Sequence, residues 1–264
     1  MNIKEHYNKL VKNKQDRHKS AVANIRYANN FIKAIFIRMY AKQKMLVLDL
    51  GCGKGGDLKK FDNAKISEYY GLDIAEVSVY DARKRHNDSE NTFRAYFDNL
   101  DVYNTPFDLK KEFDLISCQF SLHYAFSSQK SLEITVRNIN KHLRIGGYFI
   151  FTVPNKDEIL YRYNKGILKN EFYKIRYDGT GNFYYFTLKD CVNDCIEYFV
   201  DMKLLKELLE FYNIKMVRRE FFDDFYFRSI AENRELAKRM KCGELRKEEI
   251  EVISLYEFCV FKKF

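Results

Sequence analysis

Residues 47–58 read VLDLGCGKGGDL, and this stretch carries the main evidence on the fold. It begins inside a short apolar run, Met45 to Leu50, which is rich in strand-forming residues and leads directly into a glycine turn. A helix is expected from about Asp57. The turn satisfies the pattern G-x-G-x-x-G at Gly51, Gly53 and Gly56. A strand, a glycine turn and a helix in this order are typical of a nucleotide site.

Strands and helices alternate along the rest of the chain. Apolar runs and helical spacing predict strands at 69–73, 92–97, 113–118 and 148–153, and helices at 77–86 and 130–143. Two arms, 172–177 and 183–188, flank the turn 178–182 and predict a β-hairpin with an aromatic second arm. A helix at 202–212, a strand at 214–221, a helical stretch through 239 and a strand at 256–261 follow. This alternation predicts an α/β fold, a parallel sheet covered by helices on both faces.

Length and composition narrow the class of protein. The 264 residues are 46% hydrophobic and 16% aromatic, which is enough to bury the core of a single domain and excludes disorder as the main state. No apolar run approaches the ~18 residues of a membrane span, and the N-terminus has no apolar secretory core, so we expect an intracellular protein. Cys191 and Cys195 lack a second pair or a nearby histidine, which favours reduced thiols and no metal.

The net charge of +9 is concentrated at the N-terminus. Residues 1–45 hold eleven Lys or Arg against Glu5 and Asp16, whereas the remainder is formally neutral. Apolar residues between 16 and 40 recur at helical spacing, which predicts a basic amphipathic helix. The excess charge therefore predicts an anionic partner, either a nucleic acid or a lipid surface.

The carboxylates around the glycine turn indicate which nucleotide it binds. Asp49 precedes the turn and Asp57 follows it, and such charges are unfavourable beside a pyrophosphate. They suit a ligand whose near end carries an ammonium and a sulfonium group, as S-adenosylmethionine does. Asp73 ends the next strand, 22 residues after Gly51, and is placed to accept hydrogen bonds from ribose hydroxyls. A nicotinamide dehydrogenase remains an alternative on this evidence.

The stretch 47–58 also resembles motif I of class I S-adenosylmethionine methyltransferases. LRIGGYFI at 143–150 is similar to the turn that enters their fifth strand. The resemblance implies a Rossmann-like, seven-stranded, mostly parallel sheet with helices on both faces. To it the sequence adds an N-terminal helical arm and a β-hairpin insertion. Asp101 and Gln119 are then expected to address the adenine beyond the carboxyl ends of the strands.

Four further segments resemble a narrower family, the eukaryotic mRNA cap guanine-N7 methyltransferases. They are RYANNFIK at 26–33, SCQFSLHYAF at 117–126, TVPN at 152–155 and DCIEYFV at 194–200. The similarity extends over nearly the whole chain. It implies one methyltransferase domain, 1–264, whose parts are a basic helical segment (1–44), a cofactor-binding core (45–155), a cap-side hairpin insertion (156–200) and a C-terminal completion of the sheet (201–264).

The resemblance assigns three groups of site residues. Cofactor contacts are expected at Lys33, Gly51, Asp57, Asp73, Asp101, Gln119 and Tyr124. Contacts to the cap guanosine are expected at Asn29, Asn30, Phe120, His123, Pro154, Phe186, Glu197 and Tyr256. Contacts to the cap phosphates are expected at Lys54, Lys60 and Arg85.

The activity implied by the resemblance is transfer of a methyl group from S-adenosylmethionine to N7 of the terminal guanosine of GpppN-capped mRNA. N7 carries a lone pair and no proton, so we expect in-line attack without a general base, with His123 and Tyr124 as positioning residues. Capped RNA is the expected partner, and the family implies nuclear residence and contact with other capping enzymes or the RNA polymerase II machinery. A monomer without a metal or a membrane anchor is expected.

Other interpretations of the same residues stay open. His123 taken alone reads as a buried structural histidine, Asp101 as a loop carboxylate, and Lys54 and Lys60 as solvated lysines. Glu197 reads either as a solvated acid or as the bidentate acceptor of guanine N1–H and its 2-amino group. Two other functions are compatible with the motifs: another S-adenosylmethionine-dependent methyltransferase acting on RNA or a small molecule, and a non-catalytic RNA-binding module.

Overall fold

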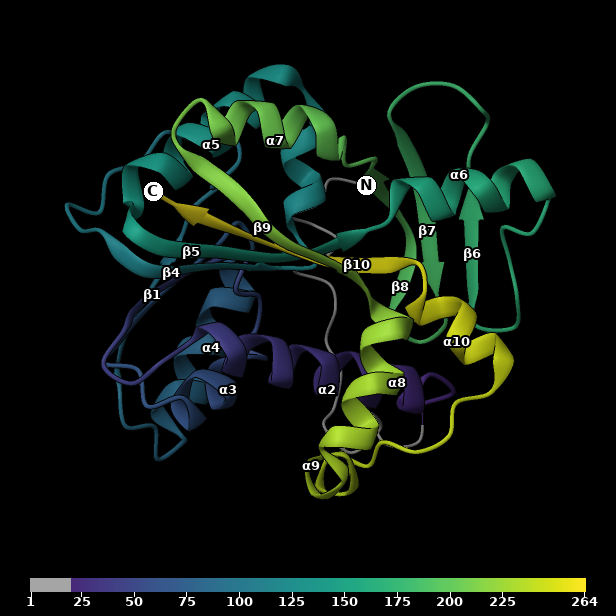
Figure 1. Ribbon diagram of the computed structural model, residues 1–264, viewed down its shortest axis with the longest axis horizontal. Coiled ribbons are helices and arrows are strands. Elements are labelled where there is room, and N and C mark those ends of the chain that lie inside the picture. Colours follow the sequence, from purple (N-terminus) through teal and green to yellow (C-terminus); the bar gives the residue numbers. More distant parts are fainter. Residues whose placement is uncertain (1–19) are drawn as a thin grey trace.

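The computed structural model describes residues 20–264, and its central feature is a seven-stranded sheet (Figure 1). The strand order is β3-β2-β1-β4-β5-β10-β9, and only pairs involving β10 are antiparallel within this described sheet. The predicted mostly parallel seven-stranded sheet is therefore confirmed. The strands are β1 (Leu46–Leu50), β2 (Glu68–Asp73), β3 (Arg94–Asn99), β4 (Phe113–Gln119), β5 (Leu143–Pro154), β9 (Ile214–Phe221) and β10 (Tyr256–Lys263).

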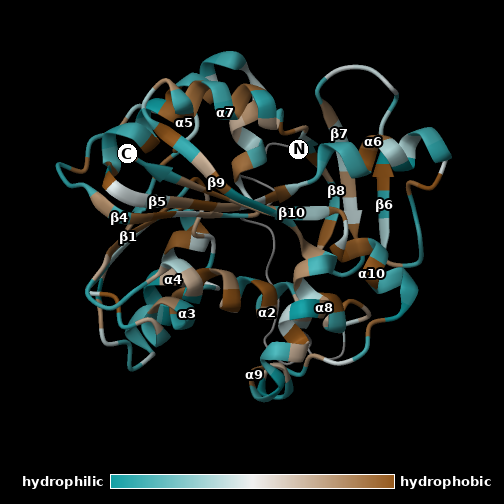
Figure 2. Ribbon diagram, viewed as in Figure 1, coloured by the Kyte–Doolittle hydropathy of each residue, from teal (hydrophilic) through white to brown (hydrophobic). Residues whose placement is uncertain are grey.

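Helices cover both faces of this sheet, as predicted (Figure 1). One face carries α5 (Gln129–His142) and α7 (Met202–Glu210). The other carries α2 (Ala23–Tyr40), α3 (Leu58–Asn63), α4 (Glu76–Asn87) and α8 (Phe222–Glu232), with α9 (Arg234–Arg239) beyond it. Alternate side chains of each central strand enter the two hydrophobic cores, as Val47 and Leu48 do. Figure 2 shows hydrophobic residues along the central strands and hydrophilic residues on the outer helix surfaces.

The N-terminal helix is part of the core. Its buried residues are Ile25, Ala28, Phe31, Ile32, Ile35, Phe36 and Ile37. The predicted helix at 16–40 is confirmed from Ala23 onward, whereas 20–22 form a turn and 16–19 lie outside the described residues. Because one whole face of this helix is apolar, the helix packs against the sheet. Its polar residues remain available to the functional site described below.

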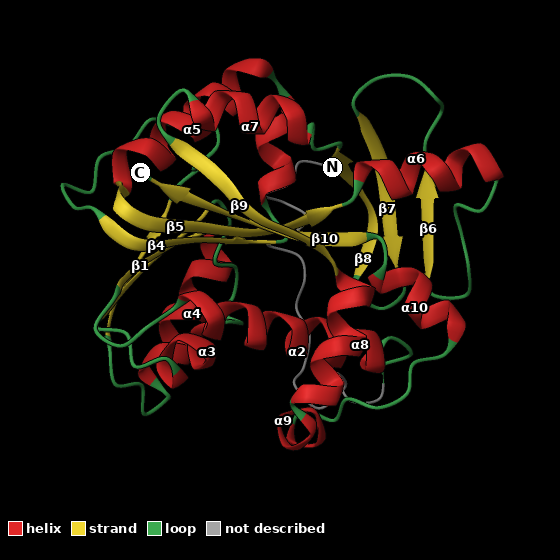
Figure 3. Ribbon diagram, viewed as in Figure 1, coloured by secondary structure: helices red, strands yellow, loops and turns green. Residues whose placement is uncertain are grey.

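The segment 156–200 departs most from the prediction. The expected hairpin is present as β6 (Tyr173–Arg176) and β7 (Phe183–Leu188), but β8 (Val192–Tyr198) pairs with β7 and makes a three-stranded antiparallel sheet. Figure 3 shows these strands as a separate group from the central sheet. Asn193 and Asp194 disfavour a strand locally, so pairing with β7 overrides their propensity. The hairpin insertion is thus corrected to a helix and a small sheet.

Three helices were not predicted, and the start of one central strand differs from the prediction. The short helix η2 (Leu122–Ser127), α6 (Lys156–Lys165) and α10 (Lys247–Ile253) have no counterpart in the predicted elements. β5 begins at Leu143 and continues through Gly146, which has a φ of +80°, instead of starting after the glycine pair. The glycines permit an irregular register against β4 where a break was expected.

Arg162 joins the inserted sheet to the rest of the domain. Its guanidinium donates to Glu158 Oε1 at 2.6 Å, to the Tyr173 hydroxyl at 2.8 Å, to the carbonyl oxygen of Glu251 at 2.7 Å and to Ser254 Oγ at 2.7 Å. These partners belong to α6, β6 and the α10 region, and the arginine is only 4% exposed. Four charge-assisted hydrogen bonds in a buried place make this residue a strong connection between the three elements.

We expect Arg162→Met to lower the free energy of unfolding by about 2–4 kcal/mol, because the partners of the buried guanidinium lose their donors. Arg176→Met is the matched control, since its ion pair with Asp194 on the same small sheet is about half exposed and is screened by water, so its loss should change stability little. Urea denaturation of both variants measures the difference. Equal losses would contradict the role given to Arg162.

Candidate active site

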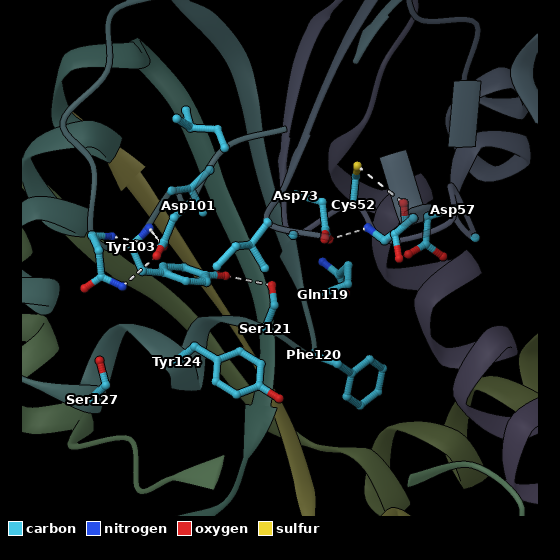
Figure 4. A pocket seen from close by; sticks show the side chains of 18 of the residues that line it. Cys52, Asp57, Asp73, Asp101, Tyr103, Gln119, Phe120, Ser121, Tyr124 and Ser127 are labelled. Carbon is cyan, nitrogen blue, oxygen red and sulfur yellow. Dashed lines mark hydrogen bonds between the residues drawn. The ribbon is translucent and has the colours of Figure 1, made fainter. Parts of the chain in front are cut away.

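A cavity of about 410 Å³ opens beyond the carboxyl ends of β1, β2 and β4 (Figure 4). The strand order reverses between β1 and β4, which is where open α/β sheets bind ligands. Every residue predicted to contact the cofactor lines this cavity: Lys33, Gly51, Asp57, Asp73, Asp101, Gln119 and Tyr124. The fold therefore brings together side chains that are up to 91 positions apart in the sequence.

The glycines of the turn differ in whether another residue could replace them, because their backbone φ angles and the space for a Cβ atom differ. Gly51 has a φ of +73°, and a Cβ there would lie 2.2 Å from Ser121 Oγ. Gly55 has a φ of +66°, and its Cβ would lie 2.6 Å from Leu58 Cδ1. Gly56 has neither a left-handed φ nor an atom within 4 Å of an added Cβ. The closely packed glycines of the turn are thus Gly51 and Gly55, whereas Gly56, the third glycine of the pattern, lies in open space.

Asp73 lies at the edge of the cavity, where its carboxylate is held by the backbone. It accepts hydrogen bonds from the N–H groups of Gly53 and Ala75, each at 2.8 Å. Burial raises the pKa of Asp73, and the two N–H donors oppose that shift. Its oxygens keep free lone pairs on the cavity side, because a carboxylate accepts about four hydrogen bonds. The group is suited to bind a pair of hydroxyls.

Asp101 and Gln119 occupy two other positions on the wall. The Asp101 carboxylate accepts from the backbone N–H groups of Tyr103 and Asn104, each at 3.2 Å, and from the Asn104 side chain at 2.9 Å. Asp101 therefore lies in a loop and also lines the cavity, so the two interpretations of this residue are compatible. The Gln119 side chain donates to Ser117 Oγ at 3.3 Å, while its Oε1 is buried and has no hydrogen-bond partner among the described residues. A buried acceptor of this kind fits a ligand that donates hydrogen bonds.

Asp57 lies between two lysines. It accepts from Lys33 Nζ at 2.8 Å and from Lys60 Nζ at 2.6 Å. Burial alone would raise the pKa of Asp57, but the two ammonium groups outweigh burial and hold it well below its usual range. Asp57 therefore stays ionised, fixes α3 to α2, and leaves Lys33 at the cavity wall.

Lys60 was predicted to contact a phosphate, and the structure gives it a different set of partners. Its ammonium donates to Asp57 Oδ1, to Asn30 Oδ1 at 3.1 Å and to the carbonyl oxygen of Gly56 at 3.3 Å. Burial lowers the pKa of Lys60, although Asp57 opposes that shift. An ammonium has three hydrogens, so Lys60 must release one of these acceptors before it can bind a phosphate directly.

The other predicted phosphate residues lie nearby on α4 and the glycine turn. Lys54 Nζ forms an ion pair with Asp81 at 2.8 Å, and both side chains are partly exposed. Arg85 is close enough for its charge to contribute to the lowered pKa of Lys60. Asn29, on α2, has a buried Oδ1 without a partner among the described residues. The Lys54–Asp81 ion pair thus joins the glycine turn to α4, the helix that also carries Arg85.

Phe120 connects the cavity with a second group of predicted residues. It lines the cavity, and its ring makes an edge contact with the Tyr256 ring at a centroid distance of 5.1 Å. Tyr256 and Pro154 are register partners on β10 and β5. The Phe120 backbone has a φ of +59°, and its N–H donates to Thr152 Oγ1 at 2.9 Å. This strained conformation turns the ring from the end of β4 toward Tyr256.

The inner face of the small sheet completes this group. Tyr184 and Phe186 are both buried on that face of β7, opposite Glu197 and Cys195 on β8. The Tyr184 hydroxyl donates to Glu197 Oε2 at 2.8 Å. Burial raises the pKa of Glu197 to about 7, although the Tyr184 hydroxyl opposes this. Of the four aromatic residues at 183–186, Tyr184 and Phe186 are therefore the two that belong to the core.

His123 is 3% exposed, and neither ring nitrogen has a hydrogen-bond partner among the described residues. Burial lowers its pKa to about 3, so the ring is neutral near pH 7. The ring lies beside that of Tyr124, with centroids 4.2 Å apart. A structural histidine in the core usually has hydrogen-bond partners for its ring nitrogens. Two buried nitrogens without partners therefore favour a ligand-binding role for His123.

Sequence reasoning missed several residues of the site. Ser121 and Tyr103 line the cavity, and the Tyr103 hydroxyl donates to Ser121 Oγ at 2.8 Å. Ser121 in turn donates to the carbonyl oxygen of Leu50 at 3.1 Å, which ties the loop after β4 to the end of β1. Tyr184 was also missed. Ser121 stands within a quoted motif, but Tyr103 and Tyr184 have no signal in the sequence because their roles come from pairing in space.

Comparison with known proteins gives a consistent result. The chain matches the family described as "mRNA (guanine-N(7))-methyltransferase domain" over residues 1–264. It is 32% identical to the mRNA cap guanine-N(7) methyltransferase of Saccharomyces cerevisiae, covering 86% of this chain and 59% of that one. It is 36% identical to the protein of the same name in Schizosaccharomyces pombe, covering 81% and 66%. The chain thus spans about three fifths to two thirds of the length of these curated relatives.

A solved S-adenosylmethionine-dependent methyltransferase from Clostridium acetobutylicum has a similar fold, with a TM-score of 0.57 at 14% identity. The match covers 91% of this chain and 92% of that one. This likeness supports the class I methyltransferase fold. Within residues 20–264 no group of three or more His, Cys, Asp or Glu side chains could hold a metal ion, and no helix there could cross a membrane.

We expect Gly51→Ala to destabilise the protein by about 1–3 kcal/mol, because the new Cβ collides with Ser121 and requires a left-handed backbone. Gly56→Ala is the matched control, and its effect should stay within about 0.5 kcal/mol because the position is open. Thermal and urea unfolding of both variants test this. A larger loss at Gly56 would show that the third glycine of the pattern is the structural one.

Proposed function

The chain belongs to the mRNA (guanine-N7)-methyltransferase family, and from this membership we propose that it methylates N7 of the terminal guanosine of capped RNA, with S-adenosylmethionine as donor. One observation carries the proposal within this chain. The cavity contains Asp73, a carboxylate suited to bind ribose hydroxyls, and it lies next to an aromatic cluster that contains the buried acid Glu197. Phe120 lines the cavity and is also part of the aromatic cluster.

The cavity residues fit S-adenosylmethionine by their chemistry. Asp73 would accept hydrogen bonds from the ribose hydroxyls, and the unpaired Oε1 of Gln119 would accept from an amino group of the adenine. Lys33 would attract the carboxylate end from its place beside Asp57. When bound, the cofactor supplies a methyl group on a sulfonium. Asp101 and Tyr124 complete the predicted wall.

The aromatic cluster fits the guanine of a cap. Glu197 would accept hydrogen bonds from N1–H and the 2-amino group, a donor pair that adenine does not present. Burial and the Tyr184 hydroxyl are the influences that shift its pKa, and no cation is among them. A carboxylate without a cation stabilises the positive charge that develops on guanine as N7 gains a methyl group. Phe120, Pro154, Phe186 and Tyr256 are the proposed walls.

Catalysis is proposed to come from positioning. Guanine N7 needs no base, so the protein's task is to hold N7, the methyl carbon and sulfur in line. His123 is neutral near pH 7 because its pKa is about 3, which suits a hydrogen-bonding and not an acid–base role. Asn29, Asn30, His123 and Tyr124 are the proposed positioning groups around the guanosine.

Positive charge outside the cavity has two proposed uses. Lys54 and Arg85 would contact the cap triphosphate. Lys60 would add positive charge nearby from its position between Asp57 and Asn30. The basic segment before residue 20 would attract the RNA chain electrostatically, and it lies outside the described residues. Nuclear residence and contact with other capping enzymes or the RNA polymerase II machinery remain predictions from the family, and a monomeric state remains a separate prediction.

Incubation with labelled S-adenosylmethionine and GpppG-ended RNA tests the activity. We expect label on N7 of the cap guanine, whereas ApppG-ended RNA should receive none, because Glu197 has no matching donor pair on adenine. Nuclease digestion and chromatography of the methylated nucleoside locate the label. Label on another atom, or on both RNAs, would point to a different methyltransferase activity, and tight RNA binding without methyl transfer would point to a binding module.

Cap affinity should depend on pH through Glu197. Its pKa of about 7 means that the side chain is protonated below that pH, and guanine binding must then displace the proton. We expect the Kd for GpppG to rise by about tenfold per pH unit below about 7 and to level off above it. Glu197→Gln should bind the cap about 10- to 100-fold more weakly, with no such pH dependence.

His123→Ala is the comparison for the same titration. It should weaken methylation by misplacing the guanine while keeping the pH profile of the parent enzyme, because His123 does not titrate near pH 7. A bell-shaped profile that disappears in His123→Ala would refute catalysis by positioning.

A further inference from the structure

We propose that Tyr184 is a positioning residue for guanine recognition, and that its buried hydroxyl orients the Glu197 carboxylate by holding one of its oxygens. The inference rests on the proposed cap methylation and adds a residue that the family resemblance did not assign.

The position of Tyr184 follows from the pairing of β7 with β8. Side chains alternate along β7, so Tyr184, Phe186 and Leu188 share its buried face. Tyr184 is the register partner of Glu197, which places the two side chains next to each other on that face. A shift of one residue in this pairing would turn Tyr184 to the outer face and separate it from Glu197.

Packing holds the Tyr184 ring in one orientation. The side chain is 1% exposed, and the ring contacts the Phe199 ring at a centroid distance of 5.0 Å. Phe199 in turn makes an edge contact with Tyr177 at 5.0 Å. The hydroxyl therefore points at Glu197 Oε2 from a rigid support, at 2.8 Å. A fixed donor of this kind limits the rotation of the carboxylate about its last bond.

The groups around Glu197 make this single donor important. Tyr184 comes from β7, Cys195 from β8 and Tyr256 from β10. Burial raises the pKa of both Tyr184 and Cys195, the charge of Glu197 raises both further, and Tyr256 adds to the shift of Tyr184. None of these side chains is a cation. Burial raises the pKa of Glu197 and the Tyr184 hydroxyl lowers it, so loss of the hydroxyl should move it further upward.

A tyrosine hydroxyl is better suited to this task than a lysine. An ammonium would neutralise Glu197 and compete with the neutral N–H donors of guanine. A hydroxyl uses one lone pair, leaves the negative charge in place, and keeps the remaining lone pairs for the ligand. The pairing thus favours an ionised carboxylate in the orientation that guanine needs.

Tyr184→Phe in the full chain tests the proposal, because it removes the hydroxyl and keeps the packed ring. We expect the Kd for GpppG to rise about tenfold at and below about pH 7, and the penalty to shrink toward about pH 8.5 as the variant's carboxylate ionises. The affinity for S-adenosylmethionine should stay within about twofold. Tyr185→Phe removes a hydroxyl from the outer face of the same strand and should change neither affinity.

A double-mutant cycle separates positioning from structure. If Tyr184 acts through Glu197, adding Tyr184→Phe to Glu197→Gln should cost less than about twofold in cap affinity. An equal loss in both backgrounds, or a loss that is the same at every pH and extends to S-adenosylmethionine, would overturn the proposal. No loss in the single variant would overturn it as well.

A carboxyl titration by NMR gives a readout that does not depend on activity. The pKa of Glu197 should be higher in Tyr184→Phe than in the parent protein, and unchanged in Tyr185→Phe. Failure of the parent protein to methylate GpppG-ended RNA would refute the proposed function while this titration still reports the Tyr184–Glu197 link. Methylation by the parent with identical Glu197 titrations would refute the link alone.

Discussion

The close approach of Gly51 to Ser121 is the constraint on which the site depends. β1 and β4 are neighbours at the point where the strand order reverses, so the loops that follow them must pass within contact of each other. Only a glycine leaves room for Ser121 Oγ, and that hydroxyl donates to the carbonyl oxygen of Leu50. The contact sets the direction of both loops. The glycine turn then reaches Asp73, and Phe120 turns toward Tyr256.

The buried acids of this protein differ in whether their hydrogen-bond donors are charged or neutral. This difference matches the roles proposed for Asp57 and Glu197. Asp57 has two lysine partners, which keep it ionised and make it a joint between α2 and α3. Glu197 and Asp49 accept hydrogen bonds from the hydroxyls of Tyr184 and Tyr69, and burial raises the pKa of each to about 7. An acid in an ion pair stabilises structure, whereas a buried acid held by a neutral hydroxyl remains able to respond to a ligand or to pH.

Most of the central sheet was predictable because its strands are short apolar runs between clear turns. The spacing of Gly51 and Asp73 placed the cofactor residues at strand ends, and the cavity confirms that they meet. The resemblance supplied the guanosine residues, since nothing local marks Glu197 as a buried acid. β8 was missed because Asn193 and Asp194 disfavour a strand, and Tyr184 because its partner is fixed only by pairing of β7 with β8. Lys60 was predicted to contact a phosphate, and its three acceptors within the protein were not foreseen.

The sequence by itself determined the fold class, the glycine turn and the family, because each of these depends on residues that are close together in the chain or on motifs read as strings. The tertiary structure decided which glycines are indispensable, that Lys33 and Lys60 both pair with Asp57, and which tyrosine supports Glu197. These properties depend on Cβ clashes, hydrogen-bond counts and cross-strand register. Their outcome is set by how the turns, helices and strands pack against one another and not by local propensity.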